Sequence, residues 1–198
     1  FNLDRGQTDL VPDASRAFGS EKVEAWEAGV KSLQLDRRLL LSAAAFRQTY
    51  EDFQLNTFLG TTFLVRSVPQ VRAKGVEVEA LYHPFEGLSL QGGVTYAQTE
   101  YGSDPVAGLP LLATKRLAFA PLWSGTLSGT YERPLGPDLT GRVTLGARYS
   151  SDYNTGSDLD PAKVQPSFWL VDGRVAVARD EAWSIEVWGR NLFDQDYR

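Results

Sequence analysis

Apolar and polar residues alternate one by one through most of the chain. In residues 142–149 the odd-numbered positions are the apolar parity, with Val143, Leu145, Ala147 and Tyr149. The even-numbered positions are the polar parity, with Arg142, Thr144, Gly146 and Arg148. A period of two predicts a β-strand with one apolar and one polar face. The same alternation predicts strands at about 22–32, 75–82, 88–97, 123–131, 169–177 and 183–193. Residues 37–48 have some helical propensity, but they run into TYEDFQ without a cap, so we interpret them as another strand.

Short and long connections alternate between these predicted strands. Short turns fall at 33–37, 84–87, 134–140 and 179–182, and long Gly/Pro/Asp-rich connections are expected at about 54–70, 102–121 and 152–166. All short turns therefore lie at one end of the sheet and all long loops at the other, which is typical of transmembrane β-barrels. The connections do not suit crossover helices. We predict an all-β fold: an antiparallel transmembrane β-barrel segment of about eight strands, part of a larger barrel.

Trp and Tyr residues gather at two levels on the apolar parity. The level near the long loops holds Trp26, Tyr96, Trp123, Tyr149 and Trp169, and the level near the short turns holds Tyr82, Tyr131 and Trp183. Aliphatic residues and glycine lie between them. Two aromatic girdles around an aliphatic band indicate a barrel wall that faces lipid. The alternatives are a soluble β-sandwich binding module with aromatic residues in its core, and a passive porin-like barrel.

Composition narrows the possible functions. The net charge is −5 and no basic run occurs, which argues against a nucleic-acid partner. The chain has no Cys, so thiol nucleophiles and Cys–His centres are excluded, and its single His argues against an acyl-transfer centre; we expect no enzyme and no cofactor. His83 precedes Pro84 at a short turn and is interpreted as a turn residue. Glu77 and Glu79 share one face, where they are read as solvated lumen lining rather than a catalytic pair.

Five segments carry a family resemblance. They are EKVEAWEAGVKS (21–32), RRLLLSAAAFRQTYEDFQ (37–54), KGVEVEALYHPFEGLSLQGGVTY (74–96), FAPLWSGTLSGTYE (119–132) and GRNLFDQDYR (189–198). In this order they resemble the C-terminal barrel region of TonB-dependent outer-membrane receptors. The resemblance implies a bacterial outer-membrane protein for energy-dependent uptake of a scarce nutrient, such as a ferric siderophore. It also implies contact with outer-membrane lipid, and with the TonB energy-transducing complex through an N-terminal region.

The predicted strand directions place both chain ends on the long-loop side. A self-contained barrel with periplasmic turns would have both ends on the other side. Residues 1–198 are therefore expected to be one part of a single receptor-type barrel domain, and the resemblance implies that the plug domain, the early strands and the final strand of that family lie outside them.

The long loops hold the candidate ligand-binding residues. Tyr101 and Tyr153 lie at loop bases, where a ring could stack on a ligand, and Asp152 and Asn154 lie beside Tyr153. The run DYNTGSDLD (152–160) spaces oxygen-bearing side chains as a Ca²⁺ loop could, but the sixth-position Gly and terminal Glu of such loops are missing. We interpret it as a solvated loop and expect no metal site.

Overall fold

The computed structural model of the chain describes residues 20–59, 62–104 and 112–197. Its main feature is one eight-stranded antiparallel sheet, which confirms the predicted fold class. The strands are β1 (Lys22–Gln34), β2 (Leu39–Leu59), β3 (Thr62–Tyr82), β4 (Leu88–Tyr101), β5 (Trp123–Pro134), β6 (Leu139–Ser150), β9 (Phe168–Arg179) and β10 (Trp183–Gly189). Residues 39–48 belong to this sheet, so the predicted strand at 37–48 is confirmed except for its first two residues, which lie in the preceding turn. Among the described residues, no helix has the length and apolar character of a membrane span.

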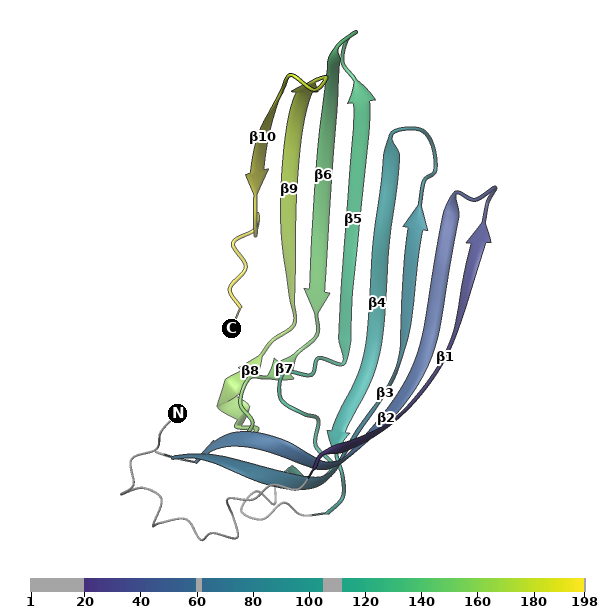
Figure 1. Ribbon diagram of the computed structural model, residues 1–198. Coiled ribbons are helices and arrows are strands. Elements are labelled where there is room, and N and C mark those ends of the chain that lie inside the picture. The colour runs from purple at the N-terminus through teal and green to yellow at the C-terminus, as the bar shows by residue number, and fades with distance from the viewer. Residues whose placement is uncertain (1–19, 60–61, 105–111, 198) are drawn as a thin grey trace.

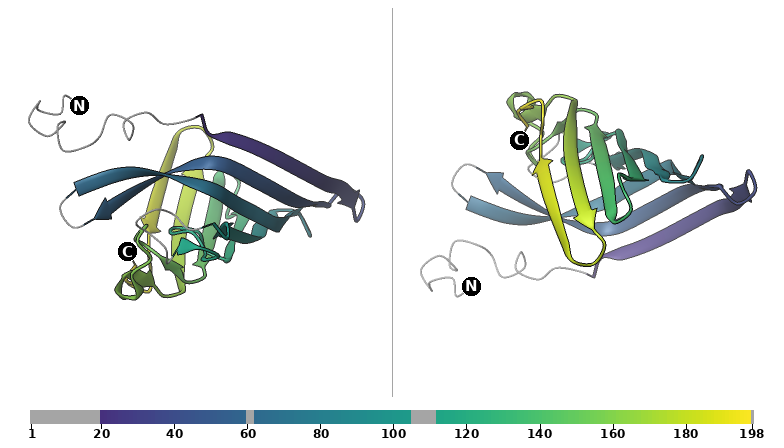
Figure 2. Two further views of the ribbon diagram at one scale, coloured as in Figure 1. Left: turned by 90° about the horizontal axis from the view of Figure 1, so that it is seen from below. Right: turned by 90° about the horizontal axis from the view of Figure 1, so that it is seen from above.

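The sheet is a meander in which each strand pairs with its neighbour in sequence. The one excursion lies between β6 and β9, where β7 (Tyr153–Asn154), the 3₁₀ turn η3 (Pro161–Lys163) and β8 (Val164–Gln165) form a small separate hairpin. Short turns join the strands at one end of the sheet and the longer loops lie at the other end, at the top and bottom of Figure 1 respectively. The sheet is curved and open, with β1 and β10 as its edges (Figure 2).

The register places the predicted apolar positions of the seven strands recognised by alternation on one face, and β2 adds Leu39, Leu41, Ala43 and Ala45 to it. Directly opposed residues of an antiparallel pair point to the same side of the sheet. The opposed pairs include Val78 with Val94, Leu127 with Ala147, and Val175 with Val187. This face is bare: Leu127 is 60% exposed and Val187 is 71% exposed. A sheet in water would cover so large an apolar surface, so this face requires another apolar phase.

The aromatic residues of both predicted girdles lie on the apolar face. At the long-loop end, the rings of Tyr96 and Trp123 lie 4.8 Å apart, and those of Tyr149 and Trp169 lie 4.9 Å apart. These rings form a row across neighbouring strands. Their contact with a membrane boundary stays a prediction.

Polar residues occupy the opposite face of the same strands. Glu132 and Arg142 are directly opposed and form an ion pair of 2.5 Å, and Thr130 and Thr144 share a hydrogen bond of 3.1 Å. A hollow of ≈ 880 Å³ lies on this face over β6, β9 and β10, with Arg148 and Arg174 in its lining. The polar face is therefore charged and hollowed, as the lumen of a barrel would be.

The predicted long loop at 54–70 is wrong. Apart from its tip, this stretch continues β2 and β3 as one extended hairpin. Gly60 and Pro69 suggested a loop, but β-branched and apolar residues fill the rest. The ladder is interrupted at one level only, where Asp52 would face Pro69, which has no N–H to donate. Asp52 has a φ of 55° there, and the hairpin turns and crosses the long-loop end of the sheet (Figure 1).

The hydrophobic core lies among the loops and not along the strands of the wall. Its buried members are Leu55, Val68, Val71, Tyr101 and Leu112, with Tyr50, Phe53, Leu117 and Leu159 packed against them. These residues come from the extended hairpin, the end of β4, the 102–121 connection and the loop after β7. The core therefore fixes the extended hairpin over the long-loop end of the sheet.

Candidate ligand-binding site at the long-loop end

A pocket of ≈ 380 Å³ opens beside this loop core. Its lining comes from three segments: Phe53, Leu55 and Asn56 of the extended hairpin, Tyr101 with Leu117, Ala118 and Phe119, and Thr155, Gly156, Ser157, Asp158 and Lys163 of the loop after β7. One side of the pocket is aromatic and the other carries a charged pair. A concave site with apolar walls and a few convergent polar groups is the usual form of a small-molecule pocket.

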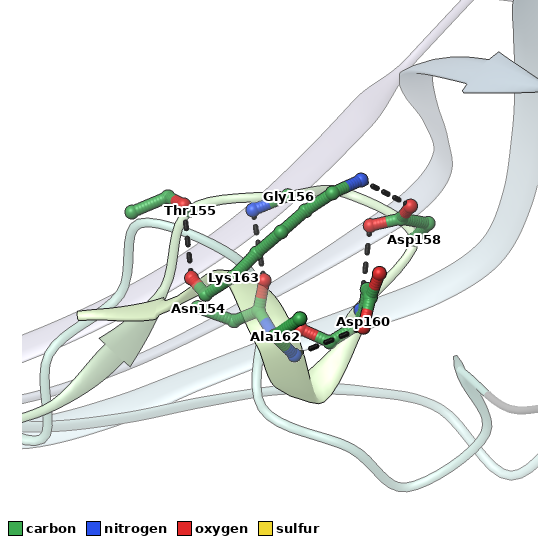
Figure 3. Close-up of polar contacts among 7 residues, drawn as sticks. All are labelled: Asn154, Thr155, Gly156, Asp158, Asp160, Ala162 and Lys163. Carbon is green, nitrogen blue, oxygen red and sulfur yellow. Dashed lines mark hydrogen bonds and ion pairs between the residues drawn. The ribbon is translucent and has the colours of Figure 1, made fainter. Parts of the chain in front are cut away.

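Hydrogen bonds within the chain organise the polar side of this pocket (Figure 3). The Thr155 hydroxyl donates to the Lys163 carbonyl at 2.9 Å, and the Lys163 Nζ lies 2.5 Å from Asp158 Oδ2. Asp160 caps η3 by accepting from the Ala162 N–H at 2.9 Å. A Cβ at Gly156 would lie 2.5 Å from both Asp158 Oδ1 and Lys163 Cδ, so a larger residue there would displace the two side chains of the ion pair. The conformation of this loop is therefore held by contacts within the chain, without a ligand.

The ion pair between Asp158 and Lys163 in the pocket wall shifts the pKa of both groups. The hydrogen bond from Lys163 holds the pKa of the Asp158 carboxyl below its usual value, and the same bond raises the pKa of the Lys163 ammonium. Both groups are therefore charged at neutral pH, and the pocket presents a dipole and not a net charge.

The structure places the four predicted ligand-binding residues in different roles. Tyr101 lines the pocket but is only 2% exposed, at the centre of the loop core. Asp152 is exposed and forms an ion pair of 2.6 Å with Arg116. The Tyr153 ring lies 6.3 Å from that of Phe119. Asn154 accepts from the Gly156 N–H at 2.8 Å and donates to the Asp160 carbonyl at 2.7 Å. Ligand contact by these residues stays a prediction.

The carboxylates of the loop 152–160 do not converge on a common point, as the ligands of a Ca²⁺ ion would. Asp152 is turned to Arg116, Asp158 to Lys163, and Asp160 to the start of η3. Within the described part of the chain, no three His, Cys, Asp or Glu residues come together in a way that could hold a metal ion.

Sequence reasoning missed Phe53, Phe119 and Lys163 as pocket residues. Phe53 was placed at the end of a predicted strand, just before the stretch read as a loop, and Phe119 was assigned to a strand entry. Phe119 is a non-glycine residue with a φ of 56° and is 66% exposed, although it is aromatic. Its exposure cannot be read from the sequence pattern.

An Asp158→Asn variant tests the charged pair. We expect backbone amides of residues 155–163 to exchange with solvent about two- to fivefold faster at pH 7, as for a lost exposed ion pair. Because the folded pKa of Asp158 is lowered, its contribution is complete above the ordinary value of 3.8 and is lost as the pH falls through the folded pKa. Hydrogen exchange should therefore show the variant and the parent protein converging in acid.

Asp180→Asn, in a short turn at the other end of the sheet, is the matched control. It removes the same charge and should leave exchange in 155–163 unchanged. A difference between the Asp158 variant and the parent that persists well below pH 3.8 would contradict the assigned role of the ion pair.

The curved antiparallel sheet, its bare apolar face and its loop-end pocket define the wall of a β-barrel receptor. The family model described as TonB dependent receptor-like, beta-barrel matches residues 3–192. The chain belongs to this family, and the resemblance noted in its sequence is confirmed.

Individual relatives agree with this assignment. The chain is 28% identical to the probable TonB-dependent receptor BfrD of Bordetella pertussis, over 98% of this chain and 26% of that protein. It is 30% identical to the ferrioxamine B receptor of Salmonella typhimurium, over 83% of this chain and 22% of that one. The ferric yersiniabactin uptake receptor FyuA of Yersinia pestis superposes with a TM-score of 0.77 at 23% identity, over 91% of this chain and 26% of FyuA. The chain thus spans about a quarter of the length of these relatives.

Proposed function

We propose that this chain forms part of the wall and outer loops of a bacterial outer-membrane receptor that imports a scarce nutrient, a ferric siderophore, with energy from the TonB complex. The observation that carries the proposal is the two-faced sheet, whose apolar side is bare and whose polar side is hollowed. An apolar outer face opposed to a polar lumen suits a membrane barrel. Relatives whose names state a ferrioxamine B receptor and a ferric-pyoverdine receptor support the ligand class.

The chain's own contribution is eight strands of wall and the loop pocket. A match to about a quarter of each relative supports a place within a larger barrel domain, in which the plug and the remaining strands are supplied by other parts of the receptor. The chain's residues offer the ligand aromatic and polar surface at the outer end.

Uptake of radioactive iron by intact cells tests the proposal. The gene product that contains this chain is expressed in a strain without other siderophore receptors, and ⁵⁵Fe-loaded ferrioxamine B and a ferric catecholate are offered in turn. We expect saturable uptake of at least one complex, and its loss when TonB is deleted. Uptake that persists without TonB would instead support a passive porin, and a gene product absent from the outer-membrane fraction would overturn the proposal.

Phe119→Ala tests the loop pocket within this function. The ring is exposed, so its loss should cost little stability, while a bound ligand would lose a stacking surface. Aromatic contacts of this kind contribute about 0.5–1.5 kcal/mol, so we expect the ligand concentration for half-maximal uptake to rise about three- to tenfold.

Phe85→Ala is the matched control for that variant. Phe85 is also an exposed aromatic residue, and its ring lies 6.3 Å from that of Tyr131 at the short-turn end. Its variant should transport like the parent protein. Equal effects of the two substitutions on half-saturation would remove the loop pocket from ligand capture.

A further inference from the structure

The charge on the polar face of the sheet is unevenly distributed. On β1 and β3 this face carries exposed carboxylates and a lysine: Glu27, Glu77, Glu79 and Lys31. On β6, β9 and β10, at the other side of the sheet, the hollow of ≈ 880 Å³ is lined by Arg148, Arg174 and Arg190. One side of the polar face therefore repels an anion, and the other side attracts it.

The positive charge of this hollow is only partly offset by carboxylates. Arg148 and Arg190 are exposed and have no carboxylate within 4.0 Å among the described residues. Arg174 Nε lies 3.4 Å from Glu186 Oε1, and because both side chains are exposed this pair contributes little. Asp172 also lines the hollow, where its carboxylate accepts a backbone N–H at 2.9 Å. The hollow therefore keeps an excess of positive charge.

An exposed tryptophan lies among these arginines. Trp188 is directly opposed to Arg174 and is 60% exposed on the polar face, whereas the other tryptophans of the chain belong to the apolar parity. The Arg190 guanidinium lies 5.2 Å from the centroid of the Trp188 ring. The floor beside them is open at Gly146, where a Cβ would meet nothing within 4 Å. We name Arg148, Arg174, Trp188 and Arg190 the arginine hollow.

We propose that the arginine hollow is a second ligand site, inside the barrel, for an anionic ferric chelate that carries aryl groups. The inference rests on the proposed function, because it takes the polar face as the lumen of a receptor. Hydrogen bonds from guanidinium groups to charged oxygens are the strong ones, and an aryl ring can stack on Trp188. Pockets for small molecules have volumes of about 300–1,000 Å³, and the hollow of ≈ 880 Å³ lies within this range.

The chemistry of the arginine hollow separates two classes of iron complex. A ferric tris-catecholate is an anion whose outer surface consists of aryl rings, so it can use both the arginines and Trp188. Ferrioxamine B has an aliphatic backbone and a free ammonium group, so it would gain nothing from these side chains. A plug surface that filled the hollow would instead have to supply carboxylates to Arg148 and Arg190. These occupants give different results in a binding experiment.

The test is calorimetric titration of the whole gene product that contains this chain, purified in detergent, with a ferric tris-catecholate. We expect two binding events in the parent protein, one at the loop pocket and one at the arginine hollow. Arg148→Gln/Arg190→Gln should weaken the second event about 10- to 100-fold and leave the first unchanged. Arg148→Gln alone should weaken it about 3- to 10-fold, which keeps the test available if the double variant folds poorly. A single event in the parent, or an unchanged second event in both variants, would overturn the proposal.

The control variant is Arg133→Gln/Arg179→Gln, which removes two arginines at the short-turn end and should show both binding events. Ferrioxamine B should give no event that depends on Arg148 and Arg190. A second event of equal affinity with ferrioxamine B would contradict the assigned ligand class. A lower unfolding temperature of the Arg148→Gln/Arg190→Gln variant, with unchanged binding, would assign the hollow to the plug domain and overturn the proposal.

Uptake of ⁵⁵Fe is measured in parallel with binding. Loss of the second binding event, with TonB-dependent uptake intact in the parent protein, would count against the arginine hollow alone. Two binding events without TonB-dependent uptake would count against the proposed transport function alone. The two failures are therefore distinguishable.

Discussion

Replacing Leu127 with arginine is expected to destabilise the membrane-inserted protein by about 2–4 kcal/mol, the cost of a cation on the lipid side at the bilayer midplane. Leu127 is four residues from both Trp123 and Tyr131 on the same face of β5, midway between the two aromatic levels. Its side chain is 60% exposed on the apolar face. Urea unfolding in lipid vesicles, followed by tryptophan fluorescence, measures the loss.

Thr126→Arg provides a sharp control because Thr126 is the preceding residue and points to the polar face. It is also exposed, so the same new charge meets water there. Arg148 lies directly opposite Thr126, so the two arginines repel each other, and the loss of stability should stay within about 1 kcal/mol, still below that of the Leu127 variant. If the two arginines cost the same, the apolar face does not meet lipid, and the soluble β-sandwich regains support.

Gly75→Ala is expected to destabilise the protein by about 3 kcal/mol, a typical cost for overpacking against atoms that cannot move away. A Cβ at Gly75 would overlap the carbonyl oxygen of Tyr96 and lie 2.7 Å from Cζ of Phe46. The first obstacle is backbone of the neighbouring strand β4, and Phe46 blocks the other direction. Relief requires separation of β3 from β4. The loss is measured by the same unfolding experiment, or by a lower temperature for loss of the folded band on a gel.

Gly146→Ala makes the same chemical change at a strand glycine of the polar face where a Cβ would meet nothing within 4 Å. Alanine restricts the unfolded chain, so this variant should be as stable as the parent or slightly more stable. Equal losses at both positions would show that strand propensity, and not crowding at Gly75, governs the result.

The strands of the wall could be predicted because the pattern that defines them lies within a few consecutive residues. Consecutive residues of a strand alternate between its two faces. Val143, Leu145 and Ala147 therefore identify the apolar face without knowledge of the adjacent strands. The positive φ of Leu35, Asp36 and Arg37, and of Gly87, belongs to tight turns that the sequence already marked as short. Local pattern and final register agree in the seven strands predicted by alternation, whereas β2 carries Leu40 and Phe46 on the polar face, opposite Leu81 and Gly75.

The loop end was not predictable to the same extent. Pro69 suggested that no strand runs through this stretch. It removes only one residue pair from the β2–β3 ladder, which continues on both sides. The pocket joins Phe53, Tyr101 and Lys163, although Tyr101 is 48 residues from Phe53 and 62 residues from Lys163 in sequence. No local pattern encodes such contacts, because they depend on where the extended hairpin comes to rest.

The position of the hydrophobic core has a kinetic consequence. Along the wall, each strand pairs with the next one in sequence, so every hairpin can form from nearby residues with a small loss of chain entropy. The loop core instead brings Leu55 together with Leu112, with Leu159 packed against it. Contacts between such distant residues form slowly. The extended hairpin and the loops of this core should therefore assemble last, after the strands of the wall are already paired.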